Sequence, residues 1–431
     1  MRKGNTGLIL AIVLLVLSLS VWTYQLGQGL IITNLRNSFS WGLYIATFAF
    51  FVGIAAGGLI VSSSVYLFDL KSLKPFTRIA SLSAFASIIG AGVIILPDIG
   101  RVDRLYQMLL SPNFRSPLVW DVIVITFYLV ITFSSVYFQL LPDWKRERRG
   151  ILAGWTDRIS QERLEEISSR WARRLALIGL PAAILIHTIT ALIFAVQTSR
   201  GWWHTATLPP DFVAIAVASG TALVLVIGIL VAGRDNFTRY QEAFGVLARI
   251  TAGALAVHFF FMYIDLLLHW WWGRPEEIGL LSFIFGRYGW LHWLEVGLPG
   301  FTMVYFFTRA GRRSPGSLIG GSALLFIGVF AHRLMLMYPA FNQIPLTLPV
   351  PGTGELGWSY PIAVGQFQPG MPVFVNYWPY VPTLWEISVA LLPFGLALFI
   401  ISWMVKEYDF LPEKGSPSLA PAARQELHQG F

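Results

Sequence analysis

The stretch from Phe39 to Leu67 reads FSWGLYIATFAFFVGIAAGGLIVSSSVYL and contains no charged residue. A run of about 20 apolar residues is long enough to cross the roughly 30 Å hydrocarbon core of a bilayer as an α-helix. The run from Ile54 to Gly58 consists mainly of small residues, which let neighbouring helices approach closely. This stretch therefore predicts a membrane-spanning helix that packs tightly against other helices.

The composition of the whole chain agrees with a membrane location. Of its 431 residues, 55% are apolar and 13% are charged, and the mean hydropathy is +0.62. Soluble domains carry about 25% charged residues, so a water-soluble enzyme is excluded. The absence of cysteine excludes disulfides, thiolate metal sites, cysteine nucleophiles and iron–sulfur clusters held by this chain. We interpret the net charge of +8 as a result of the unequal distribution of basic residues on the two sides of a bilayer, and not as a sign of nucleic-acid binding.

Apolar runs of spanning length recur along the chain and predict an all-α integral membrane protein with about ten transmembrane helices. The first run follows Met1-Arg2-Lys3, as in a signal peptide, but no small-residue cleavage site follows it, so we predict a retained helix. The predicted spans are Gly7–Gln25, Phe39–Leu67, Phe76–Pro97, Leu118–Leu141, Leu175–Gln197, Phe212–Ala232, Arg249–Trp272, Gly289–Thr308, Ser317–Tyr338 and Thr383–Val405.

Lysine and arginine are distributed unequally between the two sides of these spans. The side with both termini carries 23 of them and the opposite side carries 7. By the positive-inside rule, both termini are predicted to be cytoplasmic. Nine of the 23 lie in the loop 142–174, where a short amphipathic helix is predicted from Asp157 to Ile167. We interpret this loop as an anchor at anionic lipid in preference to a partner site.

The outer loop 339–382 is long, rich in proline, glycine and aromatic residues, and free of lysine and arginine. A loop of this composition would be poorly soluble if it stood free. We therefore predict that it packs on the membrane surface, under another subunit, or as a lid over the chain's own helices.

Ionisable residues recur at matching positions in the two halves of the chain. An Arg-Ile pair opens the third and the seventh span, and an ionisable residue closes each span 20 residues later. These pairs are offset by 171 residues, and the acids that begin the fourth and eighth spans are offset by 174. The matching residues are Arg78, Asp98 and Asp121 in the first half, and Arg249, His269 and Glu295 in the second.

This repeat predicts two parallel four-helix bundles, because four helices return the chain to its starting side. The predicted parts are the first helix with its outer loop (1–38), the first bundle (39–200), the second bundle (201–338), the outer loop (339–382), and the last helix with its tail (383–431).

The predicted orientation places most ionisable residues of the spans in the outer half of the membrane. Such residues are costly there and indicate function, so the set predicts a polar cavity that opens outward. His187 and His258 lie nearer the middle. The outer residues are Tyr44, Asp98, Asp121, Asp265, His269, His292, Glu295, His332, Arg333 and Glu386.

Several of these residues have structural alternatives. Asp98 and Asp121 are also candidates for helix caps or for ion pairs with Arg101 and Arg104. A lone guanidinium at this depth is costly, so we expect the His332-Arg333 pair to meet a neighbouring acid. A bis-histidine haem would need His187 with His258 or His332, but no helix carries two histidines at the spacing of a dihaem cytochrome. We expect no haem and no metal on this chain.

Four motifs in the first half resemble the NrfD, or polysulfide-reductase membrane subunit, family. WGLY at Trp41–Tyr44 and GIAAGG at Gly53–Gly58 are close to that family's WGLY and GxAAG. DIGR at Asp98–Arg101 resembles its DLGRP, with Val102 in place of the proline. SPLVWD at Ser116–Asp121 resembles its SPMxWD.

The second half resembles the ten-span branch of this family, through GWWH at 201–204, LPP at 208–210 and SG at 219–220. That branch includes the membrane subunits of alternative complex III, of sulfite-reductase-linked complexes and of certain hydrogenases. The resemblance covers residues 39 to about 340.

The resemblance implies a quinone-interacting subunit in the cytoplasmic membrane of a prokaryote, with menaquinone as the expected quinone. It implies an iron–sulfur partner on the outer face, a further molybdopterin, haem or hydrogenase subunit, and no cofactor on this chain, which is then not catalytic alone. The runner-up interpretations are a secondary transporter, which would need helices broken at matching places in both halves, and a b-haem membrane anchor.

Quinone reduction takes up two protons and quinol oxidation releases them, so each quinone oxygen needs an acid or base within reach. Asp121 and His187 are the predicted proton-exchanging residues. Trp41, Tyr44, Asp98 and Arg101 are predicted to line the site or orient the quinone. Asp265, His269, Glu295, His332 and Arg333 form a predicted proton path, or a structural mirror, in the second bundle.

Overall fold

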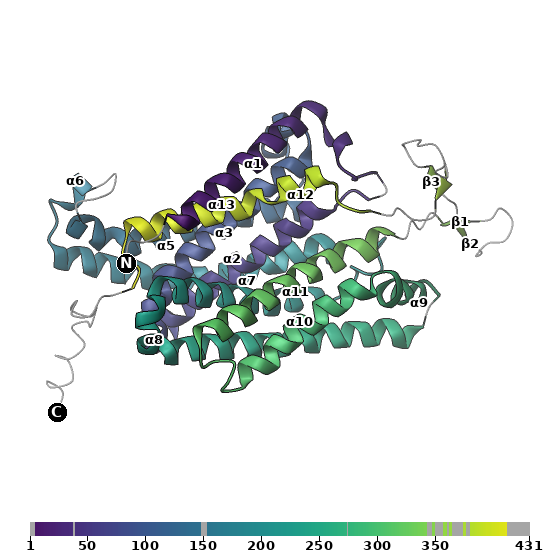
Figure 1. Ribbon diagram of the computed structural model, residues 1–431. Coiled ribbons are helices and arrows are strands. Elements are labelled where there is room, and N and C mark those ends of the chain that lie inside the picture. Colours follow the sequence, from purple (N-terminus) through teal and green to yellow (C-terminus); the bar gives the residue numbers. More distant parts are fainter. Residues whose placement is uncertain are drawn as a thin grey trace.

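The computed structural model describes residues 5–37, 39–147, 153–273, 275–342 and 380–411, together with four short strands between 347 and 375. The described part is a bundle of long helices that run side by side (Figure 1). These helices are α1 (Thr6–Gln28), α2 (Leu43–Leu67), α3 (Thr77–Ile99), α5 (Pro117–Glu147), α7 (Gln161–Ala195), α8 (Leu208–Trp272), α10 (Gly289–Phe307), α11 (Pro315–Asn342), α12 (Leu384–Ala390) and α13 (Leu392–Glu407).

Short elements join the long helices. They are the helices α4 (Tyr106–Leu110), α6 (Ala153–Thr156) and α9 (Pro275–Ser282), the 3-10 turns Leu30–Ile32, Lys71–Phe76 and Val102–Arg104, and a π-helical turn at Phe283–Arg287. The strands β1 (Thr347–Pro349) and β2 (Gly357–Ser359) pair antiparallel, as do β3 (Ile362–Ala363) and β4 (Phe374–Val375).

α2 is the central helix of the fold and packs against α3, α7 and α8. Its contact with α8 is made backbone to backbone, because a Cβ on Gly57 would collide with the carbonyl oxygen of Ala216, and one on Gly220 would collide with Gly57. The small residues of the opening stretch therefore have the packing role that the sequence predicts.

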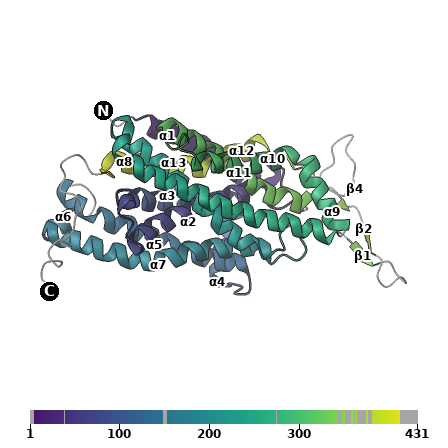
Figure 2. The same ribbon diagram turned by 90° about the horizontal axis from the view of Figure 1, so that it is seen from below.

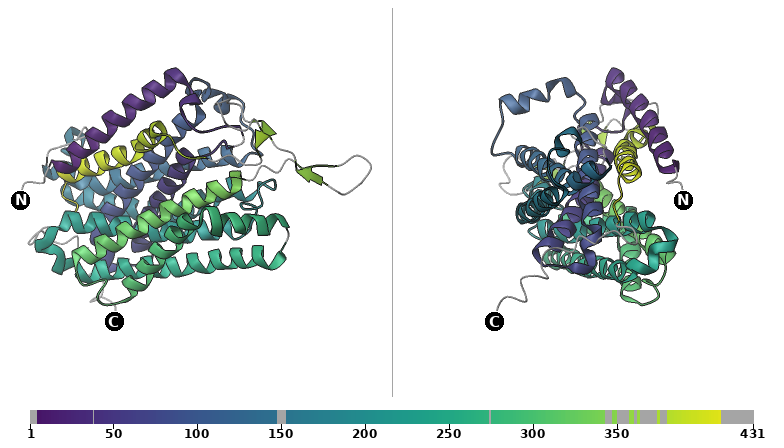
Figure 3. Two further views of the ribbon diagram at one scale, coloured as in Figure 1. Left: turned by 45° about the vertical axis from the view of Figure 1, so that its right-hand side comes forward. Right: turned by 90° about the vertical axis from the view of Figure 1, so that its left-hand side faces the viewer.

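The outer helices pack in pairs around α2. α5 lies beside α7 along one edge (Figure 2), and α1 lies beside α13 along another (Figure 3). α13 also packs on α3, and α10 packs on α11. α1 turns an apolar face outward, with Ile9 59% and Val16 61% exposed, as expected for side chains that meet lipid.

α8 contains two of the predicted spans, because the chain turns back at Gly233. This glycine has φ 68° and ψ 175°, a conformation that side chains disfavour. Asp211 and His258 are 47 residues apart along α8, which in a straight helix would separate them by about 70 Å, yet their side chains are hydrogen-bonded. The two halves of α8 therefore run side by side.

The fold class is confirmed: eight helices are long and apolar enough to cross a membrane. α8, which contains two predicted spans, is counted as one of the eight helices. α10 is not among the eight, because His292 and Glu295 lower its mean hydropathy. The number of ten crossings stays a prediction. The start of α1 and the end of α13 lie at the same end of the bundle (Figure 1), where Gly7 lies close to Ser402.

Three local predictions need correction. The amphipathic helix at 157–167 is not separate: α7 begins at Gln161, with the Ser160 hydroxyl accepting from the backbone N–H of Arg163, and continues to Ala195. The last span is divided at Leu391, before Pro393. The outer loop begins after Asn342, because α11 continues through Pro339.

α11 can pass Pro339 because two tryptophans satisfy the carbonyl groups that this proline disturbs. Proline has no N–H, so the carbonyl of Met335, four residues earlier, loses its helical partner. The indole N–H of Trp202 donates to that oxygen at 2.9 Å, and the indole of Trp203 donates to the carbonyl of Leu336 at 2.6 Å. Most of the following loop lies outside the described residues, so its packing stays a prediction.

Candidate functional site

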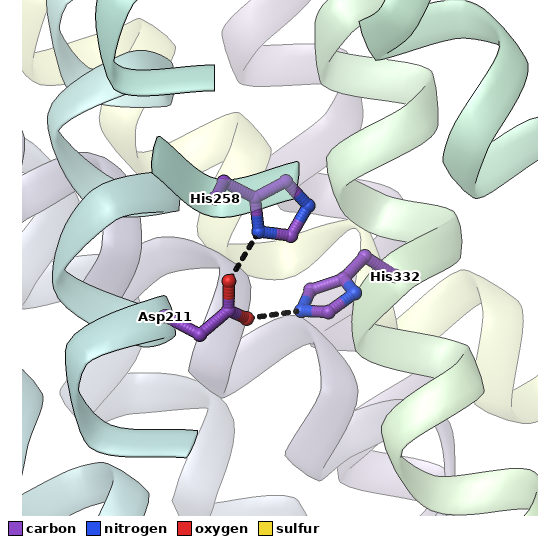
Figure 4. Close-up of side chains that lie close together, drawn as sticks. All are labelled: Asp211, His258 and His332. Atoms are coloured by element: carbon purple, nitrogen blue, oxygen red, sulfur yellow. Dashed lines mark hydrogen bonds and ion pairs between the residues drawn. The ribbon is translucent and has the colours of Figure 1, made fainter. Parts of the chain in front are cut away.

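A chain of alternating carboxyl and imidazole groups lies between α8, α10 and α11. His258 Nδ1 and Asp211 Oδ1 are 2.5 Å apart, and His332 Nε2 and Asp211 Oδ2 are 3.5 Å apart (Figure 4). The other nitrogen of His332, Nδ1, lies 3.3 Å from Glu295 Oε1. All four side chains are buried. They form one continuous series: Glu295, His332, Asp211, His258.

The local sequence explains how this series is assembled. Thr207 precedes α8 and prolines occupy its first positions, where a missing N–H costs nothing. Asp211 therefore lies in the first turn of the helix. The turn at Gly233 returns His258 to the level of Asp211, and α10 and α11 supply Glu295 and His332.

This arrangement suits proton exchange. Imidazole titrates near neutral pH and has one nitrogen to accept and one to donate. An imidazole between two carboxyl groups can take a proton from one side and release one to the other.

The same atoms resemble a metal site, since Asp211, His258 and His332 each offer a ligand atom within 4.8 Å of the others. Charge favours a proton instead. The carboxylates of Asp211 and Glu295 interact electrostatically with the buried Arg333, which leaves one negative charge. One proton balances that charge, whereas a divalent cation would leave the cluster positive. The absence of metal from this chain stays a prediction.

A cavity of about 40 Å³ adjoins the series. A water molecule needs about 10–15 Å³ of such space, so the cavity has room for a few. Asp265 lies at its wall, where its carboxylate accepts hydrogen bonds from the hydroxyls of Thr205 at 2.6 Å and Thr207 at 2.9 Å. The other polar lining residues are Trp202, Asp211, His292, Glu295 and His332.

Most of the predicted proton path is therefore assembled in one place. His269 adjoins it through Nδ1, which lies 2.8 Å from the carbonyl oxygen of Asp265. Arg333 differs from the expectation, since none of its three side-chain nitrogens bonds to an acid within the described residues. Its guanidinium lies over the ring of Phe212 instead, 4.0 Å from the centroid. Of the two residues of this pair, His332 is the one that meets the neighbouring acids.

The two predicted proton-exchanging residues, Asp121 and His187, lie on α5 and α7. Asp121 is 3% exposed, and its Oδ1 accepts a hydrogen bond from the Thr190 hydroxyl at 2.7 Å. His187 lies one turn before Thr190 and is 1% exposed. Neither of its ring nitrogens has a hydrogen-bond partner in the described part of the chain. The pair thus combines a buried acid with a buried imidazole whose nitrogens are unpartnered there.

The predicted lining residues divide between the interior and the surface. The hydroxyl of Tyr44 donates to Gln25 Oε1 at 2.7 Å, and Gln25 Nε2 donates to the carbonyl oxygen of Pro97 at 3.0 Å. Oδ1 of Asp98 is buried without a partner among the described residues. Trp41 stacks on Trp203, with ring centroids 5.7 Å apart.

Arg101 lies at the surface and pairs with Asp103 at 2.8 Å, not with Asp98 or Asp121. Hydrogen bonds from Arg101 hold the pKa of the Asp103 carboxyl below its ordinary value. Glu386, in the outer set, completes a capping box with Thr383 and accepts a hydrogen bond from the Tyr380 hydroxyl at 2.6 Å. The contacts of Glu386 are those of a helix cap.

Asp211 is the main residue that the sequence analysis did not single out. The sixth span was predicted to begin at Phe212, which left Asp211 in the outer loop. The helix begins at Leu208. An acid at the start of an apolar run is the signal that identified Asp121 and Glu295, and it applies equally to Asp211.

The fold and these groups define a polytopic α-helical membrane protein with titratable residues in its interior. The chain belongs to the NrfD polysulphide reductase family, which it matches over residues 31–345.

The chain is similar to named membrane subunits, two of them over most of its length and one over about half. A putative dimethyl sulfoxide reductase membrane subunit from Halobacterium salinarum is 33% identical over 90% of this chain and 87% of that protein. A selenate reductase subunit from Mesobacillus selenatarsenatis is 24% identical over 74% of this chain and 78% of that protein. An Hdr-like menaquinol oxidoreductase integral membrane subunit from Archaeoglobus fulgidus is 28% identical over 49% of this chain and 47% of that protein.

Proposed function

We propose that this chain is the quinone- or quinol-interacting membrane subunit of a multisubunit respiratory oxidoreductase. It exchanges electrons with an iron–sulfur subunit on the outer face and is not catalytic alone. Family membership supports this proposal, as do relatives named as subunits of reductases and of a menaquinol oxidoreductase.

The observation that carries the proposal is the buried series Glu295, His332, Asp211 and His258 beside a cavity large enough for water. Ionisable groups in the interior of a membrane protein are costly unless they have a function. Quinone reduction and quinol oxidation need proton exchange away from bulk water. The series supplies groups that can perform this exchange.

Within this proposal, Asp121 and His187 exchange protons with the quinone, and menaquinone is the quinone. Trp41, Tyr44 and Asp98 line the site, and Arg101 contributes from its rim. Asp265, His269, Glu295, His332 and Arg333 serve the proton path of the second bundle, and this path couples the reaction to proton translocation.

The electron partners are proposed from the family resemblance and from relatives named as subunits of reductases. They are a periplasmic-side iron–sulfur subunit and a further molybdopterin, haem or hydrogenase subunit. Without cysteine, this chain cannot itself ligate an iron–sulfur cluster through thiolates. Purification of the intact complex should yield these subunits together with extractable menaquinone. A chain that purifies alone from native membranes, with no bound quinone, would contradict the proposal.

We propose a location in the prokaryotic cytoplasmic membrane with both termini cytoplasmic, because of the charge asymmetry and because α1 starts and α13 ends at the same end of the bundle (Figure 1). Reporter fusions after residue 411 and within 343–379 test this orientation. The first should be active only as a cytoplasmic reporter and the second only as a periplasmic one. The reverse pattern, or one compartment for both, would refute the orientation.

We also predict that no haem is bound. His332, one candidate axial partner of His187, has Nε2 facing Asp211 and Nδ1 facing Glu295. His258, the other candidate, turns Nδ1 toward Asp211 (Figure 4). The chain, dissociated from its partners, should therefore show no Soret band. A stoichiometric band of bis-histidine type would support the b-haem anchor instead.

The transporter alternative gains no support from the described helices. The breaks at Gly233 and Leu391 lie at a turn between two spans and within the last span. They are not at equivalent places in the two bundles, as inverted or parallel transporter repeats would require.

A further inference from the structure

Arg333 is a buried cation for which the described side chains provide no hydrogen-bond acceptor. It is 0% exposed, and Nε, Nη1 and Nη2 are all without a partner in the described residues. Its contact with the face of Phe212 offsets only part of the cost of removing a guanidinium from water. Five N–H groups in this interior position require an acceptor.

His187 approaches the same place from the other bundle. A Cβ on Gly53 of α2 would lie 3.7 Å from Arg333 Nη2, 3.7 Å from His187 Nε2 and 3.9 Å from the Ser219 hydroxyl. Polar atoms of α7, α8 and α11 thus surround one point on α2. A glycine at this point leaves room for at least a methyl-sized group, because these distances are ordinary van der Waals contacts.

The hydrogen-bonding needs of the three groups define the ligand. Arg333 can only donate, whereas the Ser219 hydroxyl already donates to the carbonyl oxygen of Ile215 at 2.9 Å and so presents lone pairs. A neutral His187 has one donor nitrogen and one acceptor nitrogen. A halide would satisfy Arg333 but could not donate to Ser219. Water can accept from the guanidinium and donate to the hydroxyl or the imidazole.

We propose that the space at Gly53 is a binding site for ordered water that bridges His187 of the first bundle and Arg333 of the second. Arg333 follows His332 directly in α11, and its guanidinium interacts electrostatically with Asp211 and Glu295, two members of the series. The water would then link His187 to the same cation that the carboxylates of Asp211 and Glu295 attract. This functional consequence rests on the proposed quinone chemistry, whereas the water site does not.

Gly53→Ala tests the site without changing any ionisable group. The added methyl group would take up the space that the water needs, at tolerated distances from its neighbours, so the complex should assemble. A map of the intact complex at a resolution that shows ordered water should contain a peak within hydrogen-bond distance of Arg333 Nη2 and His187 in the wild type, and no such peak in Gly53→Ala. Quinone-linked turnover should fall about 10-fold in this variant, since His187 loses the water that can give a proton to its ring or take one from it.

Gly300→Ala is the matched control. Its Cβ would lie 3.7 and 3.9 Å from carbon atoms of Phe259, so it adds the same contact against an apolar neighbour, and turnover should stay at the wild-type rate. A wild-type map without the peak, or a peak that bromide replaces, would overturn the water site. A wild-type peak with unchanged turnover in Gly53→Ala would overturn its bridging role. If wild-type complex does not react with quinol at all, the proposed function fails, and the map alone still decides the site.

Discussion

Replacing Asp121 by asparagine should lower quinone-linked electron transfer about 100-fold or more while the complex still assembles. The amide keeps the size of the side chain and can still accept from the hydroxyl of Thr190, but it cannot bind and release a proton. The measurement is quinol oxidation or quinone reduction by the assembled complex, with assembly checked on a native gel.

The competing interpretation of Asp121 is a helix cap. A cap would cost about 1 kcal/mol when replaced and would leave turnover nearly intact. The structure weakens this interpretation, because the described hydrogen bond of Asp121 joins it to α7 and not to N–H groups at the start of α5. His187→Phe should behave like Asp121→Asn, and Asp265→Asn should spare electron transfer more. Near-normal rates in assembled Asp121→Asn complexes would remove Asp121 from the site.

Replacement of Asp211 should separate stability from proton transfer. Asp211→Ala leaves His258 and His332 without the carboxylate that both contact, and removing one partner of a buried pair costs about 3–5 kcal/mol. We expect such a complex to melt early or not to assemble. Asp211→Asn keeps hydrogen-bonding capacity in the same shape and should assemble.

The asparagine variant should nevertheless lose quinone-driven proton movement, by about 10-fold, in vesicles that contain the complex. Asp235→Asn, the same exchange at an exposed position of the same helix, is the control and should leave proton movement unchanged. Full proton movement in Asp211→Asn would exclude the series from the proton path.

The fold could be predicted because its determinants are local. Uncharged runs such as that of α2 are read directly from hydropathy, and the small residues at Gly57 and Gly220 mark a close helix contact that the structure confirms. The boundaries of the helices were harder to predict. Ser160 caps α7, which begins at Gln161 and not at Asp157. The continuation of α11 through Pro339 depends on hydrogen bonds from two tryptophans of a distant loop.

The candidate site was only partly predictable, because it depends on contacts between distant residues. The residues of the outer half were identified from the predicted orientation, but their contacts were not. Of the His332-Arg333 pair, His332 meets the neighbouring acids, and Arg333 has no hydrogen bond to an acid among the described residues. Asp211 was missed because the sixth span was predicted to start at Phe212, four residues after the observed start of α8. The convergence on Gly53 involves four helices, and no local pattern reveals it.

The most direct test of the central claim is to mix the intact, oxidised complex rapidly with a reduced menaquinol analogue and to follow its iron–sulfur clusters by electron paramagnetic resonance. The account predicts that quinol reduces the clusters within the turnover time, and that assembled Asp121→Asn complex is about 100-fold slower. Clusters that stay oxidised in the wild-type complex, although a chemical reductant reduces them, would contradict a quinone-interacting role for this chain.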